Sequence, residues 1–364
     1  MKIAVIGAGI VGLLTALEFL DQGEQVIIFD QQQAGTAASW AGGGILSPMY
    51  PWRYAPAVNA LAQHGKTMYQ ALNQRCQAVT GIDFEIHDTG MMIFDESDFD
   101  IGLNYAEQTQ QAMQRCQLLP QHELQQHLPQ VNAKFKHALY FPELSNVRNP
   151  RLLQSLIAYI QQHPNAQLMS HTPIVDFKRQ QQRITAVISQ KGETFACDTV
   201  IFCTGAWSAQ WQKLAGITLN IRPVHGQMLL FKTPPQWLKT MCMNRVMYLI
   251  PRQDGHIVCG SSMNDFGFDD TVRDDIRQDI LTASLEMIPD LAQFPIVKQW
   301  AGLRPASPDG IPFIGHLPNI ENAWANFGHF RNGLVMAPAS ARLLRQMFYE
   351  QETIVDPSAY QMNI

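Results

Sequence analysis

Hydrophobic and polar positions predict a βαβ unit at the start of the chain. Residues 3–6 are wholly apolar, residues 13–20 follow a helical spacing, and residues 25–30 form a second apolar run that ends at Asp30. Uninterrupted apolar strands are typical of parallel strands buried on both faces. We therefore expect two parallel strands joined by a helix that ends at Gly23.

Helical spacing recurs in four later parts of the chain. It extends from about residue 57 to 79, over residues 102–130, from Pro150 onwards and over residues 271–293. Proline is favoured in the first turn of a helix, so Pro150 supports the third of these assignments. We expect helices in all four segments.

Strand patterns fill most of the remaining chain. Residues 173–198 predict a β-meander, residues 199–203 another buried strand, and residues 246–263 a hairpin that turns at "QDG". A strand with a polar end is expected within "DTGMMIFDESD" at 88–98, and residues 222–300 form a second, largely antiparallel region.

These patterns predict an α/β protein with two domains. A chain of 364 residues is long for one hydrophobic core. We expect a Rossmann-like dinucleotide-binding domain and a discontinuous second domain of α+β character on an antiparallel sheet. The first comprises residues 1–84, 146–221 and 302–364, and the second residues 85–145 and 222–301.

Composition narrows the functional classes. The net charge is -5 and no cluster of Lys or Arg stands out, so we expect neither nucleic acid nor an anionic membrane as a partner. The six cysteines are scattered without a C-x-x-C pair, which indicates reduced thiols and no metal site. The apolar N-terminal stretch is broken by glycines and followed by Glu18 and Asp21, so we expect neither a signal peptide nor a membrane span. A soluble cytoplasmic protein is expected.

The first strand and helix enclose the motif G-x-G-x-x-G. Gly7 permits a tight turn, Gly9 lets the backbone approach a pyrophosphate, and Gly12 lets helix and strand pack closely. Asp30 is placed to accept a hydrogen bond from a ribose hydroxyl, which disfavours a 2′-phosphate and therefore NADP. The motif alone leaves both FAD and NAD open.

The loop "GTAASWAGGGILSP" at 35–48 favours FAD. It is rich in Gly, Ala and Ser, whereas a nicotinamide-binding domain usually continues into another helix. Ala38 and Ser39 offer donors to a second part of an extended cofactor, and the glycines at 42–44 let the backbone pass close to a flat ring. A flexible surface loop is the alternative, although Trp40 is a poor choice for a solvated linker.

Five motifs together resemble the amine- and D-amino-acid-oxidizing flavoprotein family. They are "GAGIVG", "ASWAGGGILSP", "FCTGAWS" at 202–208, "GLRPASPDGIPFIG" at 302–315 and "GHFRNGLVMAPASARLL" at 328–344. The resemblance covers nearly the whole chain. It implies non-covalent FAD, since no cysteine follows Cys259 to attach the flavin. It assigns cofactor contacts to Gly7, Gly9, Ile10, Val11, Gly12, Asp30, Gln31, Ala38, Ser39, Gly42, Gly43, Gly44, Ile45, Val175, Thr204, Gly205, Trp207, Arg304, His329, Arg331, Asn332, Gly333 and Leu334.

The same resemblance implies which residues hold the substrate. Arg304, in "GLRP", is the expected clamp for a substrate carboxylate, because a planar guanidinium binds carboxylates in a two-pronged fashion. Tyr248 is expected to donate to the same carboxylate, with Met49, Met263 and Arg331 around it. An ion pair between domains is the alternative for Arg304, an ordinary strand position for Tyr248, and core packing for the two methionines.

The C-terminal motif and one departure from the family complete the site. A helix beginning near Leu334 would aim its positive end at the charge that a reduced flavin gathers. The family commonly has arginine in the segment "PVHGQ", where this chain has His225. We expect His225 at the surface, and a polar residue behind the substrate site is the alternative.

We expect the FAD-dependent oxidative deamination of glycine or a similar small amino acid, with hydride transfer to flavin N5. The products would be an imine, then glyoxylate, ammonia and hydrogen peroxide, and the relatives with "PMYPWRYAPAV" and "PVHGQ"-like segments imply an imine supply to thiamine synthesis and a homotetramer. A dehydrogenase of D-amino acids or N-substituted glycines that passes electrons to a quinone is the nearest alternative. A nicotinamide dehydrogenase and a non-catalytic FAD protein are further alternatives.

Overall fold

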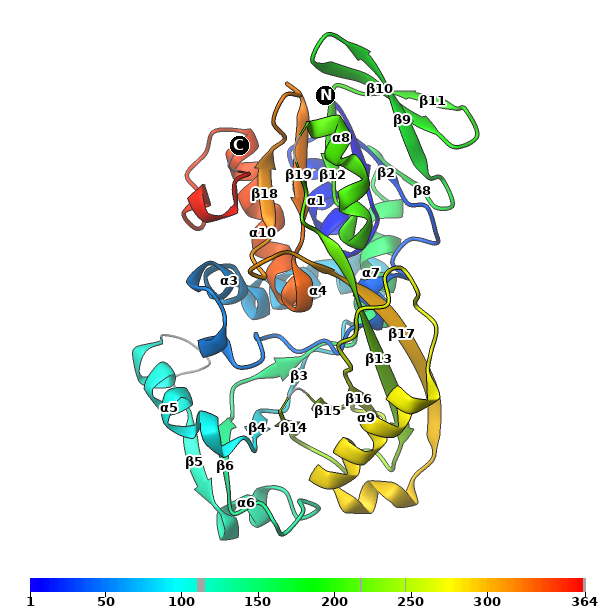
Figure 1. Ribbon diagram of the computed structural model, residues 1–364. Coiled ribbons are helices and arrows are strands. Elements are labelled where there is room, and N and C mark those ends of the chain that lie inside the picture. Colours follow the sequence, from blue (N-terminus) through cyan, green and yellow to red (C-terminus); the bar gives the residue numbers. More distant parts are fainter. Residues whose placement is uncertain (110–114, 217, 246, 363–364) are drawn as a thin grey trace.

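The computed structural model describes residues 1–109, 115–216, 218–245 and 247–362, and its elements are arranged around two large sheets (Figure 1). The six-stranded sheet has the order β18-β19-β12-β1-β2-β8. Its strands are β1 (Lys2–Ile6), β2 (Gln25–Phe29), β8 (Ala166–Met169), β12 (Thr199–Phe202), β18 (Phe313–His316) and β19 (Ala323–Phe327).

All neighbours in this sheet are parallel except β18 and β19. The apolar runs at 3–6 and 25–29 therefore pair as the sequence predicts, with Ile3 opposite Val26. Parallel strands bury both faces, so each side of this sheet needs a covering layer.

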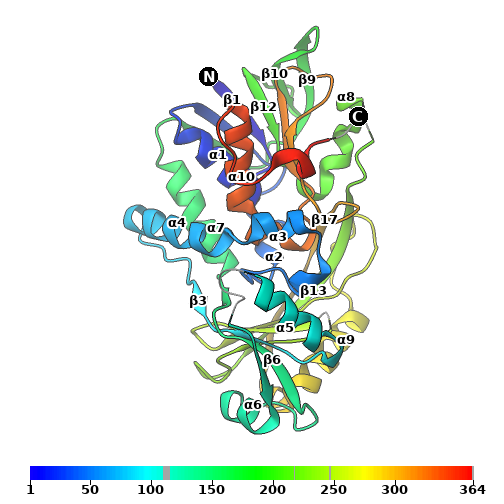
Figure 2. The ribbon, with the colours of Figure 1, turned by 90° about the vertical axis from the view of Figure 1, so that its left-hand side faces the viewer.

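Helices cover one face of the six-stranded sheet, and Figure 2 shows α1, α4, α7 and α10 gathered on one side. They enclose the largest hydrophobic core, with Leu13, Leu61 and Leu343 fully buried in it. The helices are α1 (Ile10–Leu20), α3 (Pro56–Ala62), α4 (Gly65–Thr80), α7 (Asn149–Gln161) and α10 (Gly333–Phe348).

A three-stranded antiparallel sheet covers the other face. It is the predicted meander, formed by β9 (Ile174–Gln180), β10 (Arg183–Ser189) and β11 (Thr194–Ala196). Ile184 and Val187 pack against Val200 and Phe202 of β12 in a second core cluster. The six-stranded sheet is thus buried between helices and a small sheet.

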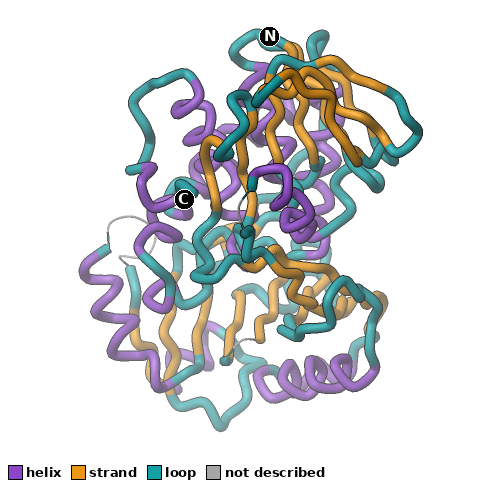
Figure 3. Tube along the Cα trace, turned by 45° about the horizontal axis from the view of Figure 1, so that its top comes forward, coloured by secondary structure: helices purple, strands orange, loops and turns teal. Residues whose placement is uncertain are grey.

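The second large sheet has eight strands in the order β17-β13-β16-β15-β14-β4-β6-β5, and Figure 3 shows it as a group of strands separate from the first. Its strands are β4 (Met91–Ile93), β5 (Gln117–Pro120), β6 (His137–Phe141), β13 (Arg222–Lys232), β14 (Met241–Asn244), β15 (Met247–Pro251), β16 (His256–Gly260) and β17 (Ile296–Ala306). Helix α9 (Asp274–Met287) packs on it, and α5 (Phe99–Gln108) and α6 (Gln121–His127) flank its far end. The predicted domain boundaries stay a prediction, and β17 runs across the one placed between residues 301 and 302.

Short elements join the two parts. They are α2 (Ala38–Ala41), α8 (Gln212–Ala215), β3 (His87–Asp88) and β7 (Ser145–Asn146). Strands β13 and β17 pair along almost their whole length, from Arg222 opposite Ala306 to Phe231 opposite Ile296. Their ends toward 222 and 306 reach back to the first domain (Figure 1).

Three sequence assignments differ from the structure. The helix expected over about 57–79 is two helices, since the chain is not helical at Gln63 and His64. The helix expected over 102–130 was wrong at residues 117–120, which form the edge strand β5 because they pair antiparallel with β6. Residues 110–114 of that prediction lie outside the described chain. Helix α9 ends at Met287, and a 3₁₀ turn continues over 289–293.

Candidate functional site

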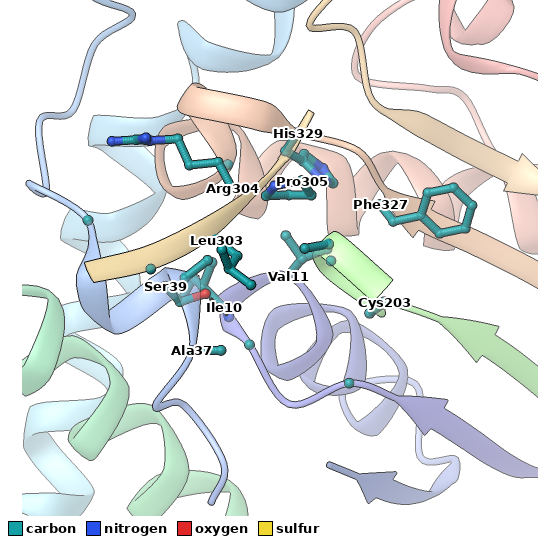
Figure 4. Close-up of a pocket in the computed structure, with 18 of the residues that line it drawn as sticks. Ile10, Val11, Ala37, Ser39, Cys203, Leu303, Arg304, Pro305, Phe327 and His329 are labelled. Carbon is teal, nitrogen blue, oxygen red and sulfur yellow. Dashed lines mark hydrogen bonds between the residues drawn. The ribbon is translucent and has the colours of Figure 1, made fainter. Parts of the chain in front are cut away.

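A single elongated cavity lies where the carboxyl ends of β1, β2 and β12 meet the second sheet. Its empty volume, including its open mouth, is about 1840 Å³. Figure 4 shows Cys203 and Phe327 at one end, and Arg304 reaching away from them at the other. The cavity therefore has a Rossmann end and an arginine end.

Two glycines shape the Rossmann end, because any larger residue in their place would clash with the backbone. A Cβ on Gly7, whose φ is +105°, would lie 2.3 Å from the carbonyl oxygen of Cys203. A Cβ on Gly12 would lie 1.8 Å from the carbonyl oxygen of Gly7, so Gly12 packs helix on strand as predicted. Helix α1 begins at Ile10, and the first amides of a helix have no internal acceptor. This end fits a pyrophosphate.

Asp30 is fixed at the end of β2. Its Oδ2 accepts a hydrogen bond from Ala8 N and its Oδ1 accepts one from Gln32 N, both at 2.8 Å. Burial raises the pKa of Asp30, while these two bonds and the nearby His171 oppose the rise. The carboxylate thus orders the glycine turn and lines the cavity, in the position that a ribose hydroxyl requires.

Helix α10 begins at Gly333 with its amino end against the cavity. Asn332 precedes it, and its buried Nδ2 has no partner among the described residues. His329 is buried, its Nε2 lies 3.1 Å from Ser340 Oγ, and burial lowers its pKa to about 3. A neutral imidazole and a helix amino end suit a ligand that carries partial negative charge.

Helix α10 contains Pro338, which cannot donate to the carbonyl of Leu334. The hydroxyl of Tyr69, a fully buried residue of α4, donates to that oxygen at 2.8 Å instead. This bond keeps the first turns of α10 in place despite the proline.

Arg304 extends from β17 to the end of the cavity opposite the Rossmann motif. Its Nη1 donates to the carbonyl oxygens of His225 at 3.2 Å and Ser262 at 3.1 Å, and its Nη2 donates to Ser261 Oγ at 2.6 Å. A Cβ on Gly226 would lie 2.1 Å from Nη1, so only glycine leaves room for the guanidinium. Three of its five N–H donors are committed to these acceptors, and the Tyr248 hydroxyl is a further hydrogen-bond partner of the guanidinium.

Tyr248 and Arg331 lie near this guanidinium. Burial lowers the pKa of Arg304, Tyr248 opposes that change and Arg331 adds to it. The Tyr248 hydroxyl donates to Met228 Sδ at 3.5 Å, and Arg331 Nη2 lies 3.8 Å from Met49 Sδ. These side chains form a compact, positively charged end of the cavity.

The structure brings most of the predicted site together. Every residue of the predicted cofactor set except Gly12 lines the cavity, as do Arg304, Tyr248, Arg331 and Met49 of the predicted substrate set. Met263 does not line it, and its side chain is 48% exposed. Contacts of these residues with ligands stay predictions.

The expected surface position of His225 was wrong. His225 is fully buried on β13, its Nε2 donates to the carbonyl oxygen of Thr271 at 3.0 Å, and its ring packs edge-on against Phe266. The segment after β16 folds over β13, which a reading of "PVHGQ" alone does not show.

Sequence reasoning also missed residues of the cavity wall. Asn149 lines it and donates from Nδ2 to the carbonyl oxygens of Ser39 at 2.8 Å and Gly42 at 3.0 Å. Its position before Pro150 indicated only a helix start. Asn326 also lines the cavity, with a buried Oδ1 that has no partner among the described residues.

Comparison with known proteins agrees with this geometry. The family model described as FAD dependent oxidoreductase matches residues 2–347. The chain belongs to this family. The glycine turn, the ordered Asp30 and the unpaired polar atoms along the cavity fit FAD, so the family resemblance, the α/β fold and the FAD cofactor predicted from the sequence are confirmed.

Curated proteins and solved structures also resemble the chain over its full length. Glycine oxidase of Pseudomonas putida is 41% identical over 99% of this chain and 97% of its own length. Glycine oxidase of Pseudomonas aeruginosa is 42% identical over 99% of this chain and 98% of its own length. The crystal structure of glycine oxidase from Geobacillus kaustophilus superposes with a TM-score of 0.91 at 24% identity, covering 100% of this chain and 98% of that one.

Two further observations concern the described part of this FAD dependent oxidoreductase. Within it, no group of three or more His, Cys, Asp or Glu residues could hold a metal ion. Nor does any helix in the described ranges combine the length and hydropathy needed to cross a bilayer.

Proposed function

We propose that the protein oxidises glycine, or a similarly small amino acid, to the imine that water converts to glyoxylate and ammonia. The observation that carries the proposal is Arg304, which keeps two donors beyond its bonds to His225, Ser262 and Ser261 and contacts Tyr248 in the cavity that fits FAD. Full-length identity of about two fifths to two glycine oxidases supports the same substrate class.

Arg304 and Tyr248 position the substrate. The guanidinium binds the carboxylate with its two remaining donors, and the Tyr248 hydroxyl turns from Met228 to donate a further bond. Fixing the carboxylate fixes the α-carbon, one bond away. When bound, FAD accepts a hydride equivalent from that carbon.

No described side chain at the arginine end is a suitable base for the amine. Arg304 and Arg331 are cations, and the neutral His329 has a pKa of about 3. We infer that glycine reacts with its amine neutral, so that the nitrogen lone pair assists the loss of hydride. The substrate loses two electrons and two protons, and oxygen takes both to become hydrogen peroxide.

Finer features belong to the same proposal. We propose that oxygen is the electron acceptor, that the imine serves thiamine synthesis, and that the protein is a cytoplasmic homotetramer. The sequence motifs shared with the family support these statements. Light scattering on the purified protein tests the assembly, and a mass other than four chains would contradict it.

Anaerobic reduction of the bound flavin tests the substrate. The holoenzyme is mixed separately with glycine, sarcosine, D-alanine, D-proline or ethylamine, and the visible absorbance of the flavin is followed in each case. We expect bleaching with glycine and none with ethylamine, which lacks the carboxylate. Admission of air should restore the absorbance and yield one peroxide per glycine. Bleaching without peroxide would favour a dehydrogenase with another acceptor, and no bleaching by any amino acid would contradict the proposal.

A further inference from the structure

The segment 39–44 has its carbonyl groups bound from outside the cavity. Each of five carbonyl oxygens accepts a hydrogen bond from a group on α7, on β17, or in the segments that follow β7 and β15. The pairs are Ser39 and Gly42 with Asn149 Nδ2, Ala41 with Trp300 Nε1 at 3.0 Å, Gly43 with Arg252 Nη2 at 2.8 Å, and Gly44 with Val147 N at 2.8 Å.

The amides of the same segment are free. Among the described residues, no acceptor is found for the backbone N–H groups of residues 43–45, and these residues line the cavity. Gly44 is buried, and an unpaired buried amide is costly, so such a group is normally satisfied by a ligand when it faces a binding site. The carbonyl bonds therefore decide which side of the segment presents its donors.

Arg252 is the unusual member of this set. Its side chain is 6% exposed and donates to Asn146 Oδ1, to the carbonyl oxygen of Val147 at 2.9 Å and to that of Gly43. No carboxylate of the described chain forms an ion pair with it. Burial lowers the pKa of Arg252 to about 10, so it stays charged at neutral pH. The nearby carboxylates of Glu85 and Asp254 favour its charged form without a direct ion pair, so the burial of this cation is offset only in part, which indicates a role beyond packing.

Strand β15 links this arginine to the substrate end of the cavity. Tyr248 and Ile250 alternate along the strand and so share one face, and Arg252 comes directly after the strand ends at Pro251. A Cβ on Gly43 would lie 2.7 Å from Ile250 Cδ1 and 2.9 Å from Tyr248 Cε2, while Arg252 binds the Gly43 carbonyl. One strand thus sets the place of Gly43 and of the substrate tyrosine together.

We propose that Arg252 is a positioning residue that holds Gly43 and Gly44 with their amides toward the FAD site and in register with Tyr248. The inference rests on the FAD site and not on the identity of the amine. The free amides stabilise the charge that the flavin gains on reduction, so a misplaced segment lowers the rate of that step.

The test compares Arg252→Met and Arg252→Lys with Arg148→Gln. Arg148 is a nearby arginine that pairs with Glu85 and Asp254 and does not contact the segment. For Arg252→Met we expect FAD affinity about 10- to 100-fold weaker, because a hydrogen bond to a charged group is lost. At saturating FAD, kcat drops by the same 10- to 100-fold factor, while KM stays within threefold of the native value. The flavin midpoint potential becomes lower. Arg252→Lys recovers part of each effect. Arg148→Gln leaves FAD affinity, midpoint potential and kcat near their native values.

Native FAD affinity and midpoint potential in Arg252→Met would overturn the proposal, as would equal changes in Arg148→Gln. If Arg252→Met does not fold, Gly43→Ala tests the same register, since its Cβ must displace Tyr248 or Ile250. It should lower the potential and kcat, and native values of both would also overturn the proposal. FAD affinity and potential are measured without substrate, so they are informative even if glycine proves to be the wrong amine.

Discussion

Arg304→Ala gives the most direct test of the substrate end of the cavity. The guanidinium has two donors left after its bonds to His225, Ser262 and Ser261. Hydrogen bonds to charged groups contribute about 1.5–3 kcal/mol each, so loss of two costs about 3–6 kcal/mol of substrate binding. That corresponds to an affinity for glycine about 10²- to 10⁴-fold weaker.

The measurement is anaerobic stopped-flow reduction of the flavin over a range of glycine concentrations. The concentration dependence gives the apparent dissociation constant, and the plateau gives the rate of reduction. We expect the constant to rise by the calculated factor while FAD stays bound in one equivalent. Arg304→Lys is the control that keeps the charge and loses the two-pronged geometry, and it should fall between the native protein and the alanine variant.

Arg304→Ala also removes three bonds that hold the ends of β13 and β16, so the variant must be shown to be folded. Its melting temperature and FAD content serve that purpose. An affinity for glycine within twofold of native, in a folded variant with full FAD, would refute the carboxylate clamp.

Three other changes test separate features. Gly226→Ala places a Cβ 2.1 Å from Arg304 Nη1 and should raise KM for glycine at least tenfold without loss of FAD, measured by steady-state oxygen uptake. The pKa of His329 is about 3 in the folded protein and 6.5 ordinarily. Below pH 6.5 the unfolded chain therefore binds a proton that the folded protein does not, and the free energy of unfolding falls as the pH decreases. Through this group the free energy of unfolding should drop by about 2 kcal/mol from pH 7 to 5. The total drop over the same range should be smaller in His329→Asn, which has no imidazole to protonate. Tyr69→Phe leaves the Leu334 carbonyl unpaired and should cost about 1–3 kcal/mol in urea unfolding.

Each of these has a result that would contradict it. An unchanged KM in Gly226→Ala would show that the guanidinium can lie elsewhere. Equal pH dependence in native protein and His329→Asn would show that the buried imidazole does not control acid stability. For Tyr69, adding Pro338→Ala to Tyr69→Phe should restore the lost stability, because alanine supplies the missing helical N–H. No gain in the double variant would contradict the role given to the Tyr69 hydroxyl.

Local signals made the Rossmann end predictable. Gly7, Gly12 and Asp30 act within one βαβ unit, so their spacing in the sequence is also their spacing in space. The family motifs added the arginine end, since Arg304 and Tyr248 come from strands whose pairing no local pattern reveals.

The remaining features depend on tertiary contacts. Gln117–Pro120 has no strong strand pattern and becomes β5 only because β6 offers an edge to pair with. His225 is buried by a segment whose Thr271, 46 residues later, accepts its hydrogen bond. Arg252 follows a hairpin strand and gives no sequence sign that its guanidinium reaches Gly43.

The carbonyl bonds to Gly43 and Ala41 have a consequence for assembly of the enzyme. The donors, Arg252 and Trp300, are synthesised about 200 residues or more after the segment that they bind, which lies within the first fifty residues. The Rossmann end also depends on late residues, because β18, β19 and α10 complete its sheet and its core. Both ends of the FAD site are therefore complete only when the chain has been synthesised to α10, and FAD binding should follow folding of the whole chain.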